Sequence, residues 1–241
     1  HGLKRIPLIS ASNLLTLKHE HVELPRCFPR YEIIQHPKNP SDFFIIMEHL
    51  SDENYLRLDS AIDQLQTAED VDRLLMQVEE IERQLAENNL SHGDFAPTNI
   101  FVSKNGLQPS KIIDLNTVYF QGAFPHTSER GHPGMHGNQF LPAIPSLHAH
   151  KFAFEVLKFT LKIIRCHDRQ GIESFVRNHI DASADETYLL DGDLLDVIFL
   201  DDQGEREGEL IDRIQEMYPL IAIEEIRLFL SNARMSNIFT F

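Results

Sequence analysis

The 241-residue sequence contains no apolar run that approaches the roughly 20 residues needed to cross a bilayer, so we expect no membrane span. It has only two cysteines, Cys27 and Cys166, and their wide separation and unlike surroundings favour a reducing compartment over a disulfide framework. Its first residues do not combine a basic region, an apolar core and a small-residue cleavage site, so no standard secretion signal is predicted. Together these absences favour a cytoplasmic location.

Basic residues are also scarce. Lysine and arginine number 22 against 37 aspartates and glutamates, and the formal net charge is -15. A general nucleic-acid binder needs a basic face that displaces counterions from the phosphates, so nucleic acid is not an expected partner. An acidic protein can still bind ATP because a bound metal ion compensates the phosphate charge, and an acidic surface suits protein partners with basic surfaces.

The remaining composition is that of an ordinary folded protein, with 42% hydrophobic and 24% charged residues. A chain of this length can form one large domain or two small lobes with a proper core. It begins with His1 and Gly2 instead of methionine, so we expect it to be a processed or excised fragment.

A polar motif followed by a β-hairpin pattern stands near the middle of the sequence. Residues 92–102 read H-G-D-F-A-P-T-N-I-F-V, and residues 111–114 read K-I-I-D. The strand-forming runs within them flank a linker that contains Asn105-Gly106, the strongest short signal for a hairpin. Two carboxylates and one amide therefore stand at the ends of this hairpin: Asp94, Asn99 and Asp114.

These residue types suit phosphoryl transfer from a nucleotide. The transferred group carries dispersed negative charge, so the protein must hold a divalent metal against the phosphates and orient an acceptor hydroxyl. Mg²⁺ prefers hard oxygen ligands, which Asn99 and Asp114 would supply, while Asp94 would orient the hydroxyl and take its proton. In the alternative interpretation, Asp94 or Asp114 only caps a turn.

This stretch resembles the protein-kinase-like family, whose catalytic loop reads H-R-D-x-x-x-x-N and whose metal aspartate opens a D-F-G. Here the pattern is H-G-D-F-A-P-T-N, and I-I-D-L-N follows with Asp114 fifteen residues after Asn99. The resemblance implies that His92, Asp94 and Asn99 form the catalytic loop and that Asn99 and Asp114 bind the metal. It also implies ATP and Mg²⁺ as cofactors.

The resemblance extends to a hinge that would bind the nucleotide. Residues 31–35 and 43–47 are predicted strands joined by a turn that contains proline and asparagine. The residues that follow the second strand, Glu48, His49 and Leu50, are similar to the family's hinge. In that family the adenine bonds to backbone groups of the hinge, which makes these three residues candidates for nucleotide binding.

Two features of the family's upper lobe are matched poorly. The sequence has no G-x-G-x-x-G turn to cover the phosphates, and the best candidate for the strand lysine is Lys4. Its glutamate partner would be Glu20 or Glu23, at the end of a weakly helical segment from residue 12 to 23. Either the phosphate-covering strands lie upstream of His1, or the upper lobe is minimal, or the protein does not transfer phosphate.

Two long helices are predicted around the motif. Residues 68–88 carry apolar side chains at spacings of three and four, with Thr67 as the N-cap, and they end directly before the catalytic loop. Residues 150–164 are the most apolar helix and stand where the family has its buried central helix. That helix usually opens with an aspartate that anchors the catalytic loop, but this chain has His150 there.

The C-terminal third is strongly acidic from Asp181 onward. We interpret these charges as solvated loops and first turns of helices, with two closing helices at residues 210–217 and 221–233.

The identity of the acceptor depends on two opposing signals. Residues 115–146 would form an activation-like segment, and residues 128–139 are loosely similar to its end in protein kinases, which favours a protein acceptor. Gly93, however, replaces the arginine that precedes the catalytic aspartate in kinases regulated by loop phosphorylation. His-Gly-Asp is instead similar to the motif of aminoglycoside- and choline-type kinases.

We therefore expect an α+β, protein-kinase-like two-lobed fold, with a short or truncated β-rich N-lobe at 1–50, a hinge at 48–50 and a mainly helical C-lobe at 51–241. The expected function is ATP- and Mg²⁺-dependent transfer of phosphate to a hydroxyl on a protein. A pseudokinase scaffold is the first alternative, favoured by the missing glycine-rich turn, His150 and Asn116. A small-molecule kinase, or transfer of AMP or another nucleotide-derived group, also stays open.

Overall fold

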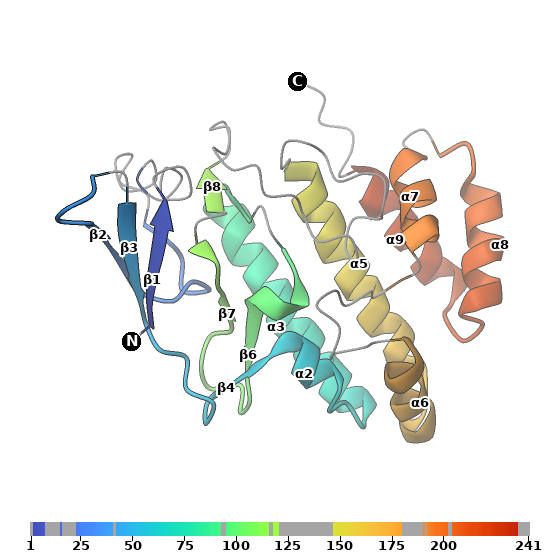
Figure 1. The fold of residues 1–241 in the computed structure, drawn as a ribbon. Coiled ribbons are helices and arrows are strands. Elements are labelled where there is room, and N and C mark those ends of the chain that lie inside the picture. The colour runs from blue at the N-terminus through green and yellow to red at the C-terminus, as the bar shows by residue number, and fades with distance from the viewer. Residues whose placement is uncertain are drawn as a thin grey trace.

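The computed structural model describes residues 2–7, 15, 23–40, 42–92, 95–115, 118–120, 147–179, 190, 192–201 and 204–235. It is a mixed α+β structure in which small antiparallel sheets form the N-terminal part and helices dominate the C-terminal part. Figure 1 shows the first sheet at one end, the C-terminal helices at the other, and two long helices, α3 (Ala68–Glu87) and α5 (Leu147–Arg165), between them. No helix within the described ranges is both long and apolar enough to cross a membrane.

The first sheet contains both N-terminal strands predicted from the sequence. They are β2 (Tyr31–Gln35) and β3 (Asp42–Met47), and β1 (Gly2–Pro7) pairs with β3 on its other edge, so the order is β1-β3-β2. All pairings are antiparallel. Phe43 and Ile45 alternate with less buried neighbours along β3, which is the pattern of a strand with one face on the core. The helix expected at 12–23 lies outside the described residues, apart from Leu15 and Glu23.

Helix α3 (Ala68–Glu87) confirms the predicted amphipathic helix and its N-cap. The Thr67 hydroxyl accepts from the Asp70 N–H, and the Asp70 carboxylate accepts from the Thr67 N–H, which is a complete capping box. Its buried face consists of Val71, Leu74, Val78, Ile81 and Leu85. Asn89 adopts a left-handed backbone with φ 53° just past the helix end, a conformation that asparagine tolerates. The chain then enters the short strand β5 (Leu90–His92).

The predicted hairpin is also present, as β6 (Ile100–Ser103) and β7 (Lys111–Ile112). The strands pair antiparallel with Ile100 opposite Ile112. In the linker, the Asn105 side-chain oxygen accepts from the Leu107 N–H, and Gly106 takes the positive φ of 69° that the turn requires. A third strand, β4 (Tyr55–Arg57), pairs with β6 on its other edge and leads directly into the short helix α2 (Leu58–Ile62).

The helical part is built on α5 (Leu147–Arg165), which contains the predicted apolar helix. It is followed by α6 (Arg169–His179), α7 (Gly192–Leu200), α8 (Glu207–Met217) and α9 (Ile223–Met235). The last two confirm the predicted closing helices with slightly different ends. Helix α5 packs against α9, where the rings of Phe159 and Phe229 stack with centroids 4.1 Å apart.

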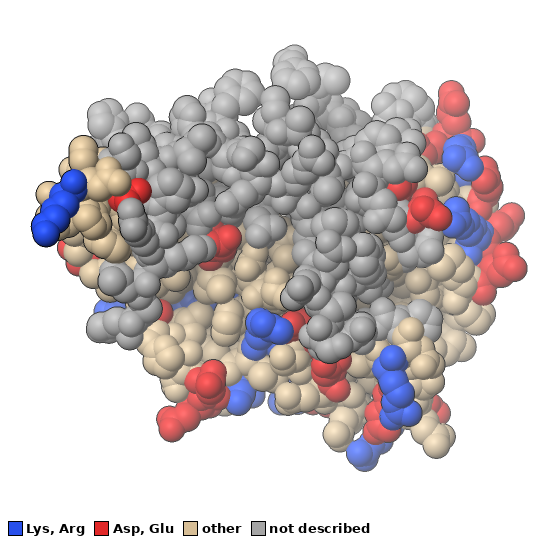
Figure 2. Space-filling model, in the orientation of Figure 1, with Lys and Arg blue, Asp and Glu red and all other residues tan. Residues whose placement is uncertain are grey.

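The acidic C-terminal third is not uniformly solvated, contrary to the expectation from the sequence. Figure 2 shows acidic and basic side chains intermingled at the edge formed by α8. Asp196 and Asp201, however, are buried. Asp201 is stabilised inside because its carboxylate lies 3.0 Å from the Arg234 guanidinium and also accepts from the Arg206 N–H.

Candidate functional site

The backbone of Ile113 links two of the predicted site residues. Its N–H donates to the Asn99 carbonyl at 2.8 Å, and its own carbonyl accepts from His92 Nε2 at 2.7 Å. A carbonyl can only accept, so His92 carries its hydrogen on Nε2 in this contact. His92 is only 1% exposed, which protects the bond from competing water. The structure therefore ties His92 and Asn99 to the residue directly before Asp114.

Asp114 itself has an unusual backbone conformation. Its φ of 63° lies in the left-handed region, which residues other than glycine seldom occupy and which aspartate tolerates better than most. The next residue, Leu115, is buried and holds the chain on the core after Asp114. Such a conformation costs free energy and persists only where the surrounding structure imposes it, and residues of this kind cluster at functional sites.

Asn99 is presented by a preorganised turn. It ends the single 3-10 turn η1 (Pro97–Asn99), in which the Asn99 N–H donates to the Ala96 carbonyl at 2.9 Å. Pro97 at the start of this turn has a backbone torsion already fixed near the helical value. Both Asn99 and Asp114 are partly exposed, so neither is sealed inside the core.

The segment just before η1 is anchored by an apolar contact. Phe95 is completely buried, and its ring centroid lies 3.9 Å from that of Phe154 on α5. In the sequence, His150 stands where the family has the aspartate that anchors the catalytic loop. The side chain of His150 lies outside the described residues. The contact between Phe95 and Phe154 gives α5 an apolar means of holding the loop. The large apolar side chain of Phe95, directly after Asp94 in the motif, is the sequence signal that could have indicated this contact.

A second short pairing brings the chain after Asp114 back to the strand before the loop. Strand β5 pairs with β8 (Val118–Phe120), with His92 opposite Val118. The two strands therefore bracket the region that contains the motif. Asp94 and Gly93, together with Asn116, lie outside the described residues, as does most of the expected activation-like segment 115–146.

The predicted hinge residues follow β3, and the first of them, Glu48, is tied to Arg30. The Glu48 N–H donates to the Arg30 carbonyl at 2.8 Å, and the Glu48 carboxylate accepts from the Arg30 N–H at 3.1 Å. This backbone hydrogen bond, helped by the nearby Lys111 and Arg30 cations, lowers the pKa of Glu48. His49 is exposed and Leu50 is half-buried.

The structure describes only parts of the proposed lysine and glutamate pair. The backbone of Lys4 lies in β1 opposite Ile45 of β3, but its side chain is outside the described residues, as is the whole of Glu20. Glu23 is exposed. The structure therefore places Lys4 on a strand next to the strand that leads to Glu48.

The donor atoms of Asn99 and Asp114 fit Mg²⁺. An amide oxygen and a carboxylate are hard ligands, and Mg²⁺ commonly takes one or two such protein ligands and completes its shell with phosphates and water. Within the described ranges no group of three or more His, Cys, Asp or Glu side chains gathers in a way that could hold a metal. An all-protein metal cage is therefore not seen in this part of the chain, whereas a site completed by a nucleotide suits the two residues.

A groove of about 820 Å³ lies beside the hinge. It is lined by residues between 23 and 33, by Glu48 and by Lys111, but neither Asn99 nor Asp114 contributes to its wall. Lys111 is only 7% exposed, and this burial lowers its pKa. Sequence reasoning missed this lysine, because its position in an apolar strand gave no sign of where its ammonium group points.

No protein-family model matches the sequence, and no curated protein matches it either.

Proposed function

We propose that this protein is an ATP- and Mg²⁺-dependent phosphotransferase of the protein-kinase-like type, with a hydroxyl on a protein as its acceptor. The observation that carries the proposal is the pair of hydrogen bonds at Ile113, which joins His92 and Asn99 to the residue before Asp114. These residues are separated by up to 22 positions in the sequence, and the motif requires them to act together.

In this proposal Asn99 and Asp114 hold Mg²⁺ through their side-chain oxygens. When bound, the metal would neutralise the negative charge on the phosphates. The short turn that ends at Asn99 and the left-handed backbone of Asp114 would fix the main chain at the two ligands before any nucleotide arrives. Preorganised ligands lose little freedom on binding, which favours affinity.

Asp94 would orient the acceptor hydroxyl and accept its proton during transfer. It follows His92 by two residues and precedes the buried anchor Phe95, so the chain is held on both sides of it. His92 acts through its bond to the Ile113 carbonyl and serves as a positioning residue in this scheme.

The nucleotide base would bind to backbone groups of residues 48–50. Support comes from the side chain of Glu48, which is engaged with Arg30 on the groove side and leaves recognition to the main chain. The strand position of Lys4, next to β3, supports its assignment as the lysine that contacts the phosphates.

Phosphate transfer itself is the test of this proposal. The protein and the Asp94→Asn variant are incubated with ATP labelled at the γ-phosphate, Mg²⁺ and a library of peptides that contain serine, threonine or tyrosine. We expect label in the peptides with the native chain and none with Asp94→Asn, which should still bind nucleotide. In a parallel reaction that contains aminoglycosides or choline in place of the peptides, label in those compounds alone would assign a small-molecule kinase. Nucleotide binding without any transfer would assign a pseudokinase, and the absence of both activities would refute the proposal.

A further inference from the structure

Residues 25–30, with the sequence P-R-C-F-P-R, connect three parts of the candidate site, and we call them the bridging segment. Its first attachment is to β7, the strand that leads to Asp114. The Lys111 ammonium group donates to the Arg26 carbonyl at 2.8 Å and to the Phe28 carbonyl at 3.1 Å. Between them, the Cys27 carbonyl accepts from the Ile112 N–H at 2.7 Å. Three consecutive carbonyls of the segment therefore bond to two consecutive residues of β7.

The second attachment is to α3, the helix that leads to His92. The Cys27 N–H donates to the side-chain oxygen of Gln84 at 2.7 Å. Gln84 is held in turn by Glu80 one turn earlier, since its amide nitrogen donates to that carboxylate at 2.7 Å. Cys27 is fully buried at this junction, so water does not compete for these bonds.

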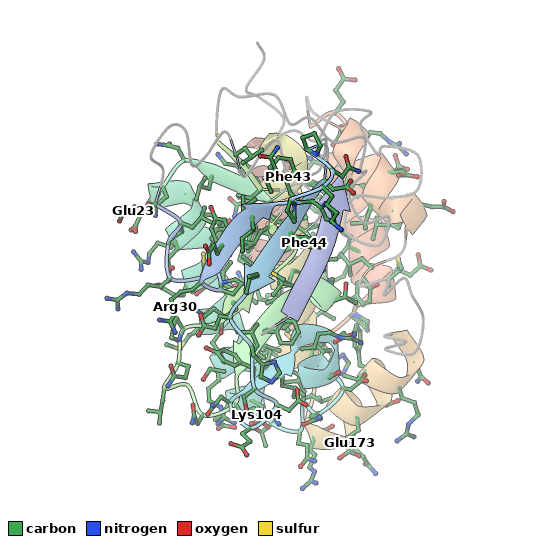
Figure 3. All side chains as sticks on the ribbon, turned by 60° about the vertical axis from the view of Figure 1, so that its left-hand side comes forward. Glu23, Arg30, Phe43, Phe44, Lys104 and Glu173 are labelled. Atoms are coloured by element: carbon green, nitrogen blue, oxygen red, sulfur yellow. The ribbon has the colours of Figure 1, made fainter. Side chains whose placement is uncertain are left out.

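The third attachment is to the predicted hinge. Arg30 exchanges two bonds with Glu48, one through each backbone N–H. In Figure 3 the bridging segment ends beside β2 and β3, where Arg30 extends outward at the edge of the molecule. Its side chain is 91% exposed, so the two backbone N–H groups, and not the guanidinium, make the firm connection.

Lys111 is the central residue of this arrangement. A buried ammonium group is costly unless it is hydrogen-bonded, and two of its donors are used on main-chain carbonyls of the segment. No carboxylate accepts a bond from it among the described contacts, although the Glu48 carboxylate attracts it at longer range. The lysine therefore serves to hold a loop in place and not to form a surface ion pair.

We propose that the bridging segment is a strut that fixes the hinge relative to the strand before Asp114, and that Lys111 is its positioning residue. Its consequence for nucleotide binding rests on the proposed function, whereas the mechanical connection does not. Without Lys111 the hinge and the metal ligands would each keep their own structure, but the bonds of Cys27 to Ile112 and Gln84 would hold their spacing less firmly.

The buried thiol of Cys27 gives a direct readout of this connection. Cys27 is completely buried, so an alkylating reagent reaches its thiol only when the segment opens, and burial also raises its pKa to about 12. The experiment uses a Cys166→Ser background, which removes the exposed cysteine. The rate of Cys27 alkylation is compared with the rate of global unfolding, which far-UV circular dichroism follows in this tryptophan-free chain.

The test variant is Lys111→Met, and the matched control is Lys158→Met. Lys158 is also a largely buried lysine, but it lies on α5 and its two partners, Glu82 and Glu155, are outside the segment. We expect Lys111→Met to raise alkylation of Cys27 about tenfold or more beyond any change in global unfolding, as loss of a charge-assisted hydrogen bond implies. In Lys158→Met the alkylation should change only in step with global unfolding.

A second variant keeps the test decisive if Lys111→Met does not fold. Gln84→Met removes the acceptor of the Cys27 N–H and should also speed alkylation selectively. Alkylation that follows global unfolding in both Lys111→Met and Gln84→Met would overturn the strut. Calorimetric titration with ATP and Mg²⁺ then tests the consequence: Lys111→Met should weaken binding about tenfold, and Lys158→Met should not. Should the native chain bind no nucleotide, the proposed function fails, while alkylation still decides the strut.

Discussion

His92 Nε2 donates a hydrogen bond to the carbonyl of Ile113, 21 residues further along the chain, at 2.7 Å. The bond crosses from the strand before the motif to the residue before Asp114, and it joins a buried His92 to a half-buried Ile113. It is the contact that converts two separate stretches of sequence into one candidate site.

Replacement of His92 by phenylalanine should test how much this contact stabilises the fold. The ring volume is roughly kept, but the Ile113 carbonyl loses its donor in a place that water reaches poorly. We expect the free energy of unfolding to fall by about 1–3 kcal/mol, as measured by urea denaturation. The control is His49→Phe at an exposed position, which should change it by less than about 0.5 kcal/mol. Equal stability of the two variants would show that the bond is not formed.

Substitutions at Asp114 should separate its backbone conformation from its charge. Because the residue holds a φ of 63°, glycine and asparagine should be accommodated well, whereas alanine should be less stable than asparagine by about 1–2 kcal/mol. Thermal or urea unfolding of the three variants measures this order. If alanine were as stable as asparagine and glycine, the left-handed backbone at this position would be contradicted.

The pH dependence of stability should reveal the ion pairs of Lys158. Burial disfavours its ammonium group, but the Glu82 and Glu155 carboxylates outweigh this effect and raise its pKa above the ordinary 10.5. The stabilisation is therefore complete below pH 10.5 and is lost as the pH rises through the higher pKa of the folded protein.

Lys111 titrates in the opposite sense, because its pKa is lowered and rising pH relieves the cost of its burial. The measurement therefore compares the native protein with Lys158→Met, since both contain Lys111 and its contribution cancels in the difference. The difference in unfolding free energy between native and variant should be constant near neutral pH and shrink above pH 10.5. A difference that grew with alkaline pH would contradict the assignment.

The sequence allowed some elements to be predicted because their signals are local. Helix α3 has an apolar stripe and its cap within one segment, and β6 and β7 are separated by an asparagine-glycine turn. Helix α6 was not predicted, although Ile172, Phe175 and Val176 form a short buried stripe at spacings of one, three and four. Its charged remainder hid this signal.

The contacts that assemble the candidate site are of another kind. The bonds of Lys111 to Arg26 and Phe28 span 85 and 83 residues, and no local pattern encodes such a pairing. Strands β5 and β8 have three residues each, too few for periodicity to show, and only their mutual pairing defines them. The motif therefore predicted His92, Asn99 and Asp114 as site residues, but the hydrogen bonds that join His92 and Asn99 to Ile113 became apparent only in the structure.

The most direct test of the account is a calorimetric titration with ATP, with and without Mg²⁺, of the native chain, of Asp114→Asn and of the surface control Asp212→Asn. Asparagine keeps the left-handed backbone but removes the carboxylate that would hold the metal. We expect micromolar binding, worth about 8 kcal/mol, that needs both Mg²⁺ and Asp114 and is unchanged in Asp212→Asn. No binding at millimolar ATP, or equal affinity in Asp114→Asn and the native chain, would contradict a metal-nucleotide site at Asn99 and Asp114.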